Sequence, residues 1–141
     1  MAPRLRKFIL RFSGVMLTML GILHLAVTPI LARLIESNVP ATADWLIPPM
    51  LLNHVVVGIL LLPLGILTFY ASPAAVLGER WALIVVRTTA VTVAALPVTL
   101  FVVMGTRYFG ALPFAVATII VTVAALTILL ASLWPASSSG D

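Results

Sequence analysis

Residues 48–70 have the sequence PPMLLNHVVVGILLLPLGILTFY, which contains no Asp, Glu, Lys or Arg. A helix needs about 20 consecutive, mostly apolar residues to cross the hydrocarbon core of a bilayer, and this stretch is long enough. Pro48 and Pro49 stand at its start, where a helix does not use the backbone N–H that proline lacks. The stretch therefore predicts a transmembrane helix that begins at its proline pair.

Three further apolar stretches, at about residues 8–32, 81–104 and 112–134, are also long enough to cross a membrane. Polar segments at 33–46 and 71–80 and a turn from residue 105 separate the four stretches. Hydrophobic residues make up 62% of the 141-residue chain and charged residues 9%. Soluble domains have roughly 25% charged residues, so lipid must cover most of this surface. We predict an all-α integral membrane protein, a four-helix up-down transmembrane bundle that forms one domain over residues 1–135, with a short polar tail at 136–141.

The cations predict how the bundle crosses the membrane. Arg4, Arg6, Lys7 and Arg11 lie at the start of the chain, whereas each later connection has a single arginine. Because cytoplasmic segments are rich in Lys and Arg, we predict a cytoplasmic N-terminus, and four helices return the C-terminus to the same side. In a bacterium this would be the inner membrane. We expect the first helix to remain uncleaved, because its apolar stretch exceeds the about 7–15 residues of a signal-peptide core.

Small and polar residues recur on one face of each predicted helix, at steps of three and four residues. In a bilayer such residues mark helix–helix contacts, because apolar residues face lipid and protein alike. Gly14 and Gly21 of the first helix and Gly58 and Gly65 of the second have the same spacing, so we predict that these two helices pack closely through their glycines. The other residues assigned to packing are Thr28, Asn53, Thr92, Thr99, Thr118 and Thr122.

The two histidines, His24 and His54, are predicted to lie at one membrane depth. His24 precedes Arg33 by nine residues, and His54 follows Trp45 by nine residues. At 1.5 Å per residue, both histidines lie about 13 Å from the outer boundary of the bilayer. Both also belong to the small-residue faces of antiparallel helices, so their rings are predicted to face each other inside the bundle.

Three interpretations of the histidine pair remain open. Each ring could only stabilise the fold, through a hydrogen bond to a carbonyl or to a threonine hydroxyl. Alternatively, the rings are the axial ligands of a haem b, with Gly21 and Gly58 leaving space for the macrocycle and Arg33 and Arg107 reaching its propionates. In the third interpretation the pair is a metal or proton site, although two histidines are too few for tetrahedral zinc. The absence of cysteine excludes thiolate metal sites and iron–sulfur clusters.

Three classes of function fit the sequence, in order of preference. The first is a non-catalytic subunit or scaffold of a larger membrane complex, because the predicted loops are too short to hold a catalytic site. The second is a bis-histidine b-haem or quinone-linked electron-transfer protein that uses His24 and His54. The third is a small oligomeric transporter or channel. We assign no catalytic residue, and we expect the partners to be the lipid bilayer, other membrane subunits or further copies of the chain, and not nucleic acid.

Overall fold

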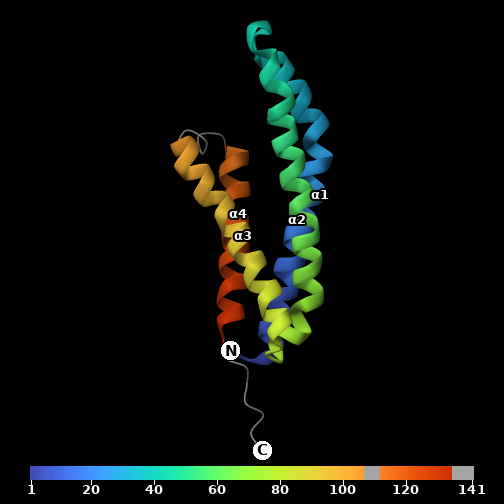
Figure 1. Ribbon diagram of the computed structural model, residues 1–141, viewed down its shortest axis with the longest axis vertical. Coiled ribbons are helices and arrows are strands. Elements are labelled where there is room, and N and C mark those ends of the chain that lie inside the picture. Colours follow the sequence, from blue (N-terminus) through green and yellow to red (C-terminus); the bar gives the residue numbers. More distant parts are fainter. Residues whose placement is uncertain (107–111, 135–141) are drawn as a thin grey trace, which may run out of the picture.

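The computed structural model describes residues 1–106 and 112–134, and this part of the chain is helical apart from its short connections. The four long helices are α1 (Pro3–Asn38), α2 (Ile47–Val76), α3 (Arg80–Met104) and α4 (Leu112–Leu133), and a short 3-10 helix, η1 (Ala41–Leu46), joins α1 to α2 (Figure 1). Each long helix is long and apolar enough to cross a membrane, which confirms the predicted all-helical class with four such helices. The predicted polar tail, 136–141, lies outside the described residues.

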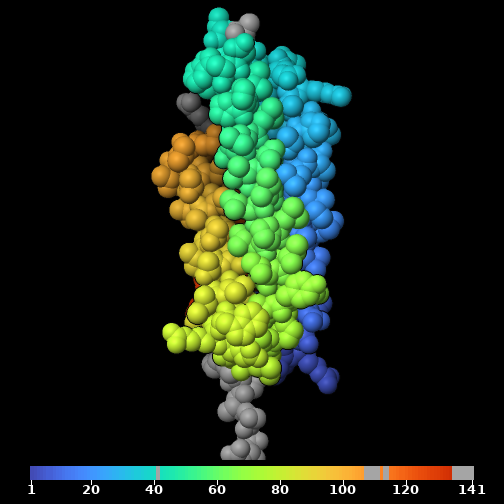
Figure 2. All heavy atoms as spheres, turned by 45° about the vertical axis from the view of Figure 1, so that its right-hand side comes forward, coloured from blue at the N-terminus to red at the C-terminus, as the bar shows by residue number. Residues whose placement is uncertain are grey.

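Consecutive helices run antiparallel, so the bundle has two distinct ends (Figure 1). At the terminal end lie the first turn of α1, the α2–α3 link and the last turn of α4. At the hairpin end lie η1 and the last turn of α3. α1 and α2 lie side by side along their length and rise beyond α3 at the hairpin end, as Figure 2 also shows. The α1–α2 pair is therefore the long half of the molecule and the α3–α4 pair the short half.

The first two helices are longer than the hydropathy pattern predicts. The predicted polar loop at 33–46 is mostly helical, because α1 continues to Asn38 and η1 occupies most of the remainder. α2 likewise continues past its predicted end at residue 70 to Val76. Arg33 and Glu36 are exposed on the extended part of α1. Exposed polar residues do not interrupt a helix, so hydropathy marks the end of the apolar segment and not the end of the helix.

Glycines bring the backbones of α1 and α2 into direct contact. A Cβ atom built on Gly21 would lie 2.9 Å from the carbonyl oxygen of Gly58, and one built on Gly14 would lie 2.8 Å from that of Gly65. Real Cβ atoms essentially never approach another atom this closely, so any side chain at these positions would push the helices apart. The two glycine pairs thus face each other across the α1–α2 interface.

The connected cluster of buried hydrophobic residues fills only the terminal half of the bundle, and Ile35 of α1 is buried apart from it at the hairpin end. The members of this cluster closest to the hairpin end are Leu20 on α1, Leu61 on α2, Val93 on α3 and Val121 on α4. Beyond that level, none of residues 94–106 at the end of α3 is fully buried. The bundle is therefore closed at its terminal end and open at its hairpin end.

Arg6 joins three helices at the terminal end. Its side chain is only 2% exposed. Nε donates to the carbonyl oxygen of Ala131 at 2.7 Å, and Nη1 donates to that of Val76 at 3.4 Å. These carbonyls belong to the last turns of α4 and α2, where they have no partner within their own helix and carry partial negative charge. The buried cation thus satisfies two helix ends at once.

The buried faces of α3 and α4 differ from the predicted ones. Thr92 and Thr99 are exposed and Thr118 and Thr122 are half-buried, whereas the fully buried residues of α3 are Ala82, Val86, Thr89, Ala90 and Val93. Thr92 therefore does not pack inside this bundle. The physical reason is that a threonine hydroxyl needs no neighbouring helix, because it can donate to the carbonyl four residues earlier in its own helix. Hydrogen bonds of this kind are made by Thr18, Thr28, Thr68, Thr122 and Thr127.

Candidate functional site

A cavity of about 850 Å³ lies at the hairpin end, where the common core stops. All four helices line it, with side chains from within residues 24–39, 50–61, 96–104 and 117–121. Leu61 and Val121, which belong to the core, form its floor. Pockets for small molecules measure about 300–1,000 Å³, so this cavity has the size of a ligand site.

Pro97 marks the level at which α3 passes from the core to the cavity. Val93 is the last fully buried residue of α3, and the lining residues of this helix begin at Leu96. A proline inside a helix removes one backbone hydrogen bond, here to the carbonyl of residue 93. α3 continues through Pro97 nonetheless. The weakened point of the helix therefore coincides with the boundary between the closed and open halves of the bundle.

His24 and His54 face each other where α1 and α2 line the cavity. Their ring centroids are 4.6 Å apart and their planes are inclined by 26°, so the rings are stacked. Nδ1 of His24 donates to the carbonyl oxygen of Leu20 at 3.1 Å, one turn earlier in α1. Thr28 donates to the carbonyl of His24 at 2.8 Å. The stacked pair agrees with two histidines that face each other at one level of the bundle.

The Nε2 atom of His54 is buried and has no hydrogen-bond partner. No other buried side-chain nitrogen or oxygen in the described part of the chain is in this condition. Leaving such an atom unpaired costs about 1–3 kcal/mol, and native proteins keep few of them. Because His54 also lines the cavity, its ring is part of the wall that a bound molecule would contact.

The remaining polar groups of the cavity wall are amides and hydroxyls, supplied by Asn38, Asn53, Thr99 and Thr118. Most other lining side chains are aliphatic, and no Asp, Glu, Lys or Arg is among the described lining residues. A wall of this composition offers hydrogen bonds and apolar contact but no counter-charge. A buried charge without a partner is costly, so the cavity suits a neutral molecule with an apolar body.

The histidine pair does not have the geometry of a haem site. Two imidazoles that bind one iron point their nitrogens at it from opposite sides, which places the ring centroids roughly 6 Å apart for metal–nitrogen bonds of about 2 Å. In this protein the rings are stacked face to face at 4.6 Å. The backbone contact of Gly21 with Gly58 also leaves no space for a macrocycle between α1 and α2. Arg33 is exposed and does not line the cavity, and Arg107 lies outside the described residues.

The metal interpretation gains no further ligand from the structure. Residues 1–106 and 112–134 contain no group of three or more His, Cys, Asp or Glu that could hold a metal ion. The two imidazoles would supply half of the four ligands that zinc takes. What the pair does supply is hydrogen-bonding capacity in the wall of an otherwise mostly aliphatic cavity.

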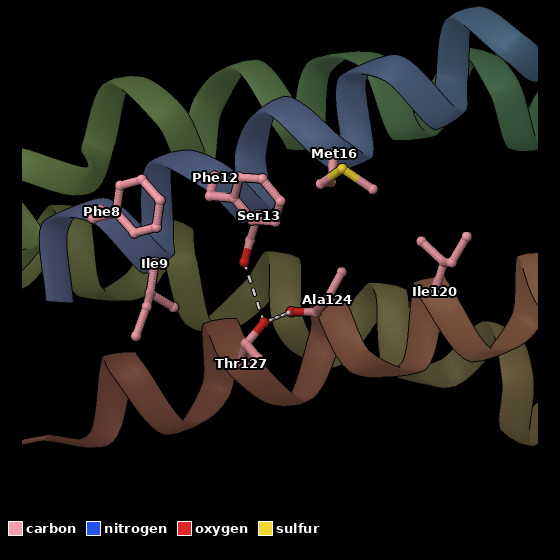
Figure 3. A pocket seen from close by; sticks show the side chains of 8 residues that line it. All are labelled: Phe8, Ile9, Phe12, Ser13, Met16, Ile120, Ala124 and Thr127. Carbon is pink, nitrogen blue, oxygen red and sulfur yellow. Dashed lines mark hydrogen bonds between the residues drawn. The ribbon is translucent and has the colours of Figure 1, made fainter. Parts of the chain in front are cut away.

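A second, smaller cavity of about 160 Å³ lies between α1 and α4 in the terminal half (Figure 3). Figure 3 shows the Ser13 hydroxyl pointing from α1 to Thr127 of α4, at 3.1 Å, and the Thr127 hydroxyl in turn bonded to the carbonyl of Ala124 at 2.9 Å. The other lining side chains, such as Phe8 and Phe12, are apolar. Both polar groups are already paired, so this pocket lacks the open hydrogen-bonding capacity of the larger one.

Sequence reasoning missed much of the cavity wall. Leu34, Met50 and Leu100 line it, but an apolar residue that faces a cavity is of the same kind as one that faces lipid. Asn38 could not be assigned to the wall because it lies beyond the predicted end of the first helix. On α3, the only cavity-lining residue that the sequence singles out is Thr99, which is predicted to pack inside the bundle.

Comparisons with protein-family models, with curated proteins and with solved structures find no match for this chain. The cavity and its chemistry are therefore the basis for assigning a function.

Proposed function

We propose that this protein is a non-catalytic membrane protein that binds a neutral, lipid-soluble molecule in the cavity at its hairpin end. The observation that carries the proposal is the 850 Å³ cavity itself, together with the unpaired nitrogen of His54 on its wall. A protein that served only as a scaffold would gain nothing from such a cavity, because filling it with side chains would add packing contacts. The cavity thus favours ligand binding over the scaffold function.

The proposed orientation places the terminal end in the cytoplasm. Arg4, Arg6, Lys7 and Arg11 lie in the first turns of α1, and cytoplasmic segments are rich in such cations. The hairpin end and its cavity would then lie in the outer half of the bilayer. A lipid-soluble molecule would reach the cavity from the membrane, where its concentration is high.

The chemistry of the wall defines the class of ligand. An apolar body would contact the aliphatic side chains of α3 and α4, and a hydrogen-bonding head would meet His54 and Asn53 on α2. Alkylated quinones and phenols have these two parts and carry no charge. A quinone carbonyl would accept a hydrogen bond from the His54 ring, whereas an alkyl ammonium or carboxylate ion would find no counter-charge. This quinone-type binding retains part of the electron-transfer hypothesis without its haem.

The proposal is tested with three molecules that share one chain length: 2-decyl-1,4-benzoquinone, decanoate and decyltrimethylammonium. Binding to the purified protein in maltoside micelles is measured by equilibrium dialysis against protein-free micelles. We expect saturable binding of the benzoquinone and only micellar partition of the two ions. Equal binding of all three molecules would overturn the assignment of a neutral ligand.

Two variants on neighbouring residues of α3 supply the matched control. Both positions are exposed, but Thr99 lines the cavity and Val98 does not, so Thr99→Trp adds an indole at the cavity wall and Val98→Trp adds the same indole away from it. We expect benzoquinone binding to be lost in Thr99→Trp and kept in Val98→Trp. The same affinity in both variants would show that the molecule binds elsewhere.

A further inference from the structure

The terminal end holds a second feature that the proposed function does not use, namely two arginines that share the last turn of α4. Arg6 donates from α1 to the carbonyl of Ala131, and Arg87 donates from α3 to the carbonyl of Ser132 at 3.1 Å. Because these carbonyls belong to consecutive residues, the two positive charges lie near each other. Two guanidinium groups from different helices thus converge on adjacent carbonyls.

Neither arginine has an acidic partner in the described part of the chain. Their hydrogen bonds go to carbonyl oxygens, which carry only partial charge. The nearest acidic residue along α3, Glu79, accepts a hydrogen bond from Trp81 at 2.6 Å, and it precedes Arg87 by about 12 Å of helix. The pair therefore has a net charge of two that the described residues leave without a counter-ion.

The two arginines differ in accessibility. The side chain of Arg6 is 2% exposed, so its charge is buried and a ligand cannot contact it directly. Arg87 is exposed, and only one of the five N–H groups of its guanidinium has an acceptor among the described residues. Arg87 can thus donate to an external anion, and the buried charge of Arg6 strengthens the attraction.

The surroundings of Arg87 are apolar. Ile84 and Val91, which precede and follow it by one turn on the same face of α3, are 55% and 63% exposed. A hydrated ion makes no favourable contact with these apolar side chains, whereas the acyl chains of a phospholipid would cover them. A guanidinium within an apolar strip favours an anion that is itself attached to an apolar body.

We propose that Arg87, backed by Arg6, binds the phosphate group of an anionic phospholipid at the terminal end of the bundle. The guanidinium donates charge-assisted hydrogen bonds to the phosphate oxygens, and the strip around Ile84 and Val91 contacts the acyl chains. This site is separate from the cavity at the hairpin end and stands on different residues, so it does not depend on the proposed ligand there.

The test is native mass spectrometry of the purified protein in maltoside micelles, titrated with dioleoylphosphatidylglycerol, dioleoylphosphatidylcholine or dioleoylglycerol. We expect a saturable phosphatidylglycerol adduct on the wild-type protein, weaker binding of phosphatidylcholine because of its choline cation, and none of the diacylglycerol. Arg87→Gln is expected to weaken the phosphatidylglycerol adduct about tenfold, as befits the loss of a charge-assisted contact. Arg80→Gln, an exposed arginine at the start of the same helix, is the matched control and should leave the adduct unchanged.

Each other outcome would overturn the proposal. An equal loss in Arg80→Gln would indicate a diffuse surface charge rather than a site. Displacement of the lipid by millimolar inorganic phosphate would indicate a site for the free ion. Thermal unfolding in pure maltoside establishes that all variants are folded before the comparison.

Discussion

The clearest consequence of the unpaired Nε2 atom is that removing the His54 ring nitrogens should stabilise the ligand-free protein. In His54→Phe a slightly larger aromatic ring can still stack on His24, but the buried nitrogen without a partner is gone. An unpaired buried polar group costs about 1–3 kcal/mol. The side chain of His54 is only half-buried, and its ring also interacts favourably with the backbone of His24, so we expect the low end of this range, a gain of about 1 kcal/mol in the free energy of unfolding.

His24→Phe is the matched control, and the expected sign is opposite. His24 has a partner, since its Nδ1 donates to the carbonyl of Leu20 at 3.1 Å. Losing one hydrogen bond of this kind costs about 0.5–1.5 kcal/mol, so the variant should be less stable than the wild type by that amount. Two identical substitutions in stacked rings are thus predicted to change stability in opposite directions.

Equilibrium unfolding in mixed dodecylsulfate and maltoside micelles, followed by circular dichroism, measures both changes. The stabilised His54→Phe variant should also bind 2-decyl-1,4-benzoquinone more weakly than the wild type, because the ligand has lost its hydrogen-bonding partner. If His54→Phe loses as much stability as His24→Phe, then Nε2 of His54 has a partner within the folded protein. That result would refute the claim that this nitrogen is available to a ligand.

Three further predictions concern packing, the terminal end and orientation. Gly21→Leu should lower the free energy of unfolding by about 1–3 kcal/mol, because its side chain would overlap the facing backbone of α2. Ala26→Leu, on the exposed side of α1, should change the free energy of unfolding little. Equal unfolding midpoints of the two variants in detergent would contradict this prediction. Arg6→Met should lower the free energy of unfolding by about 1.5–3 kcal/mol, since two helix-terminal carbonyls lose a charged donor. Arg4→Met should leave the free energy of unfolding unchanged because Arg4 is exposed. Chemical unfolding of both variants provides the comparison. A cysteine introduced at the exposed Ser37 should react with a membrane-impermeant maleimide only from the outside of the cell, and reaction from the cytoplasmic side alone would reverse the proposed orientation.

The helices and the α1–α2 interface could be predicted because each leaves a strong signal in the sequence. Long apolar stretches have few other uses, and glycines at a seven-residue spacing permit a close approach that no other residue allows. The arrangement of α3 and α4 could not be predicted in the same way. Val91 is 63% exposed and Val93 is fully buried, so valines two positions apart on α3 differ in their neighbours without any difference in chemistry.

The candidate site was likewise predictable only in part. Histidine is rare in apolar helices, so counting residues along two antiparallel helices was enough to place His24 beside His54. Whether the rings point at a shared iron or stack on each other depends on their side-chain torsions, and the hydrogen bond from His24 to Leu20 holds one of the rings. The cavity itself arises because α3 and α4 leave the common core near Pro97, and no single residue encodes that gap.

Photolabelling tests most directly whether the cavity at the hairpin end binds a neutral, lipid-soluble molecule. The protein in maltoside micelles is irradiated with a decyl chain attached to benzophenone, and the labelled peptides are identified by mass spectrometry. We predict labels within residues 50–61 and 96–104, and their disappearance in Thr99→Trp but not in Val98→Trp. Labels spread evenly over the exposed apolar residues of all four helices, and unaffected by Thr99→Trp, would contradict ligand binding in the cavity.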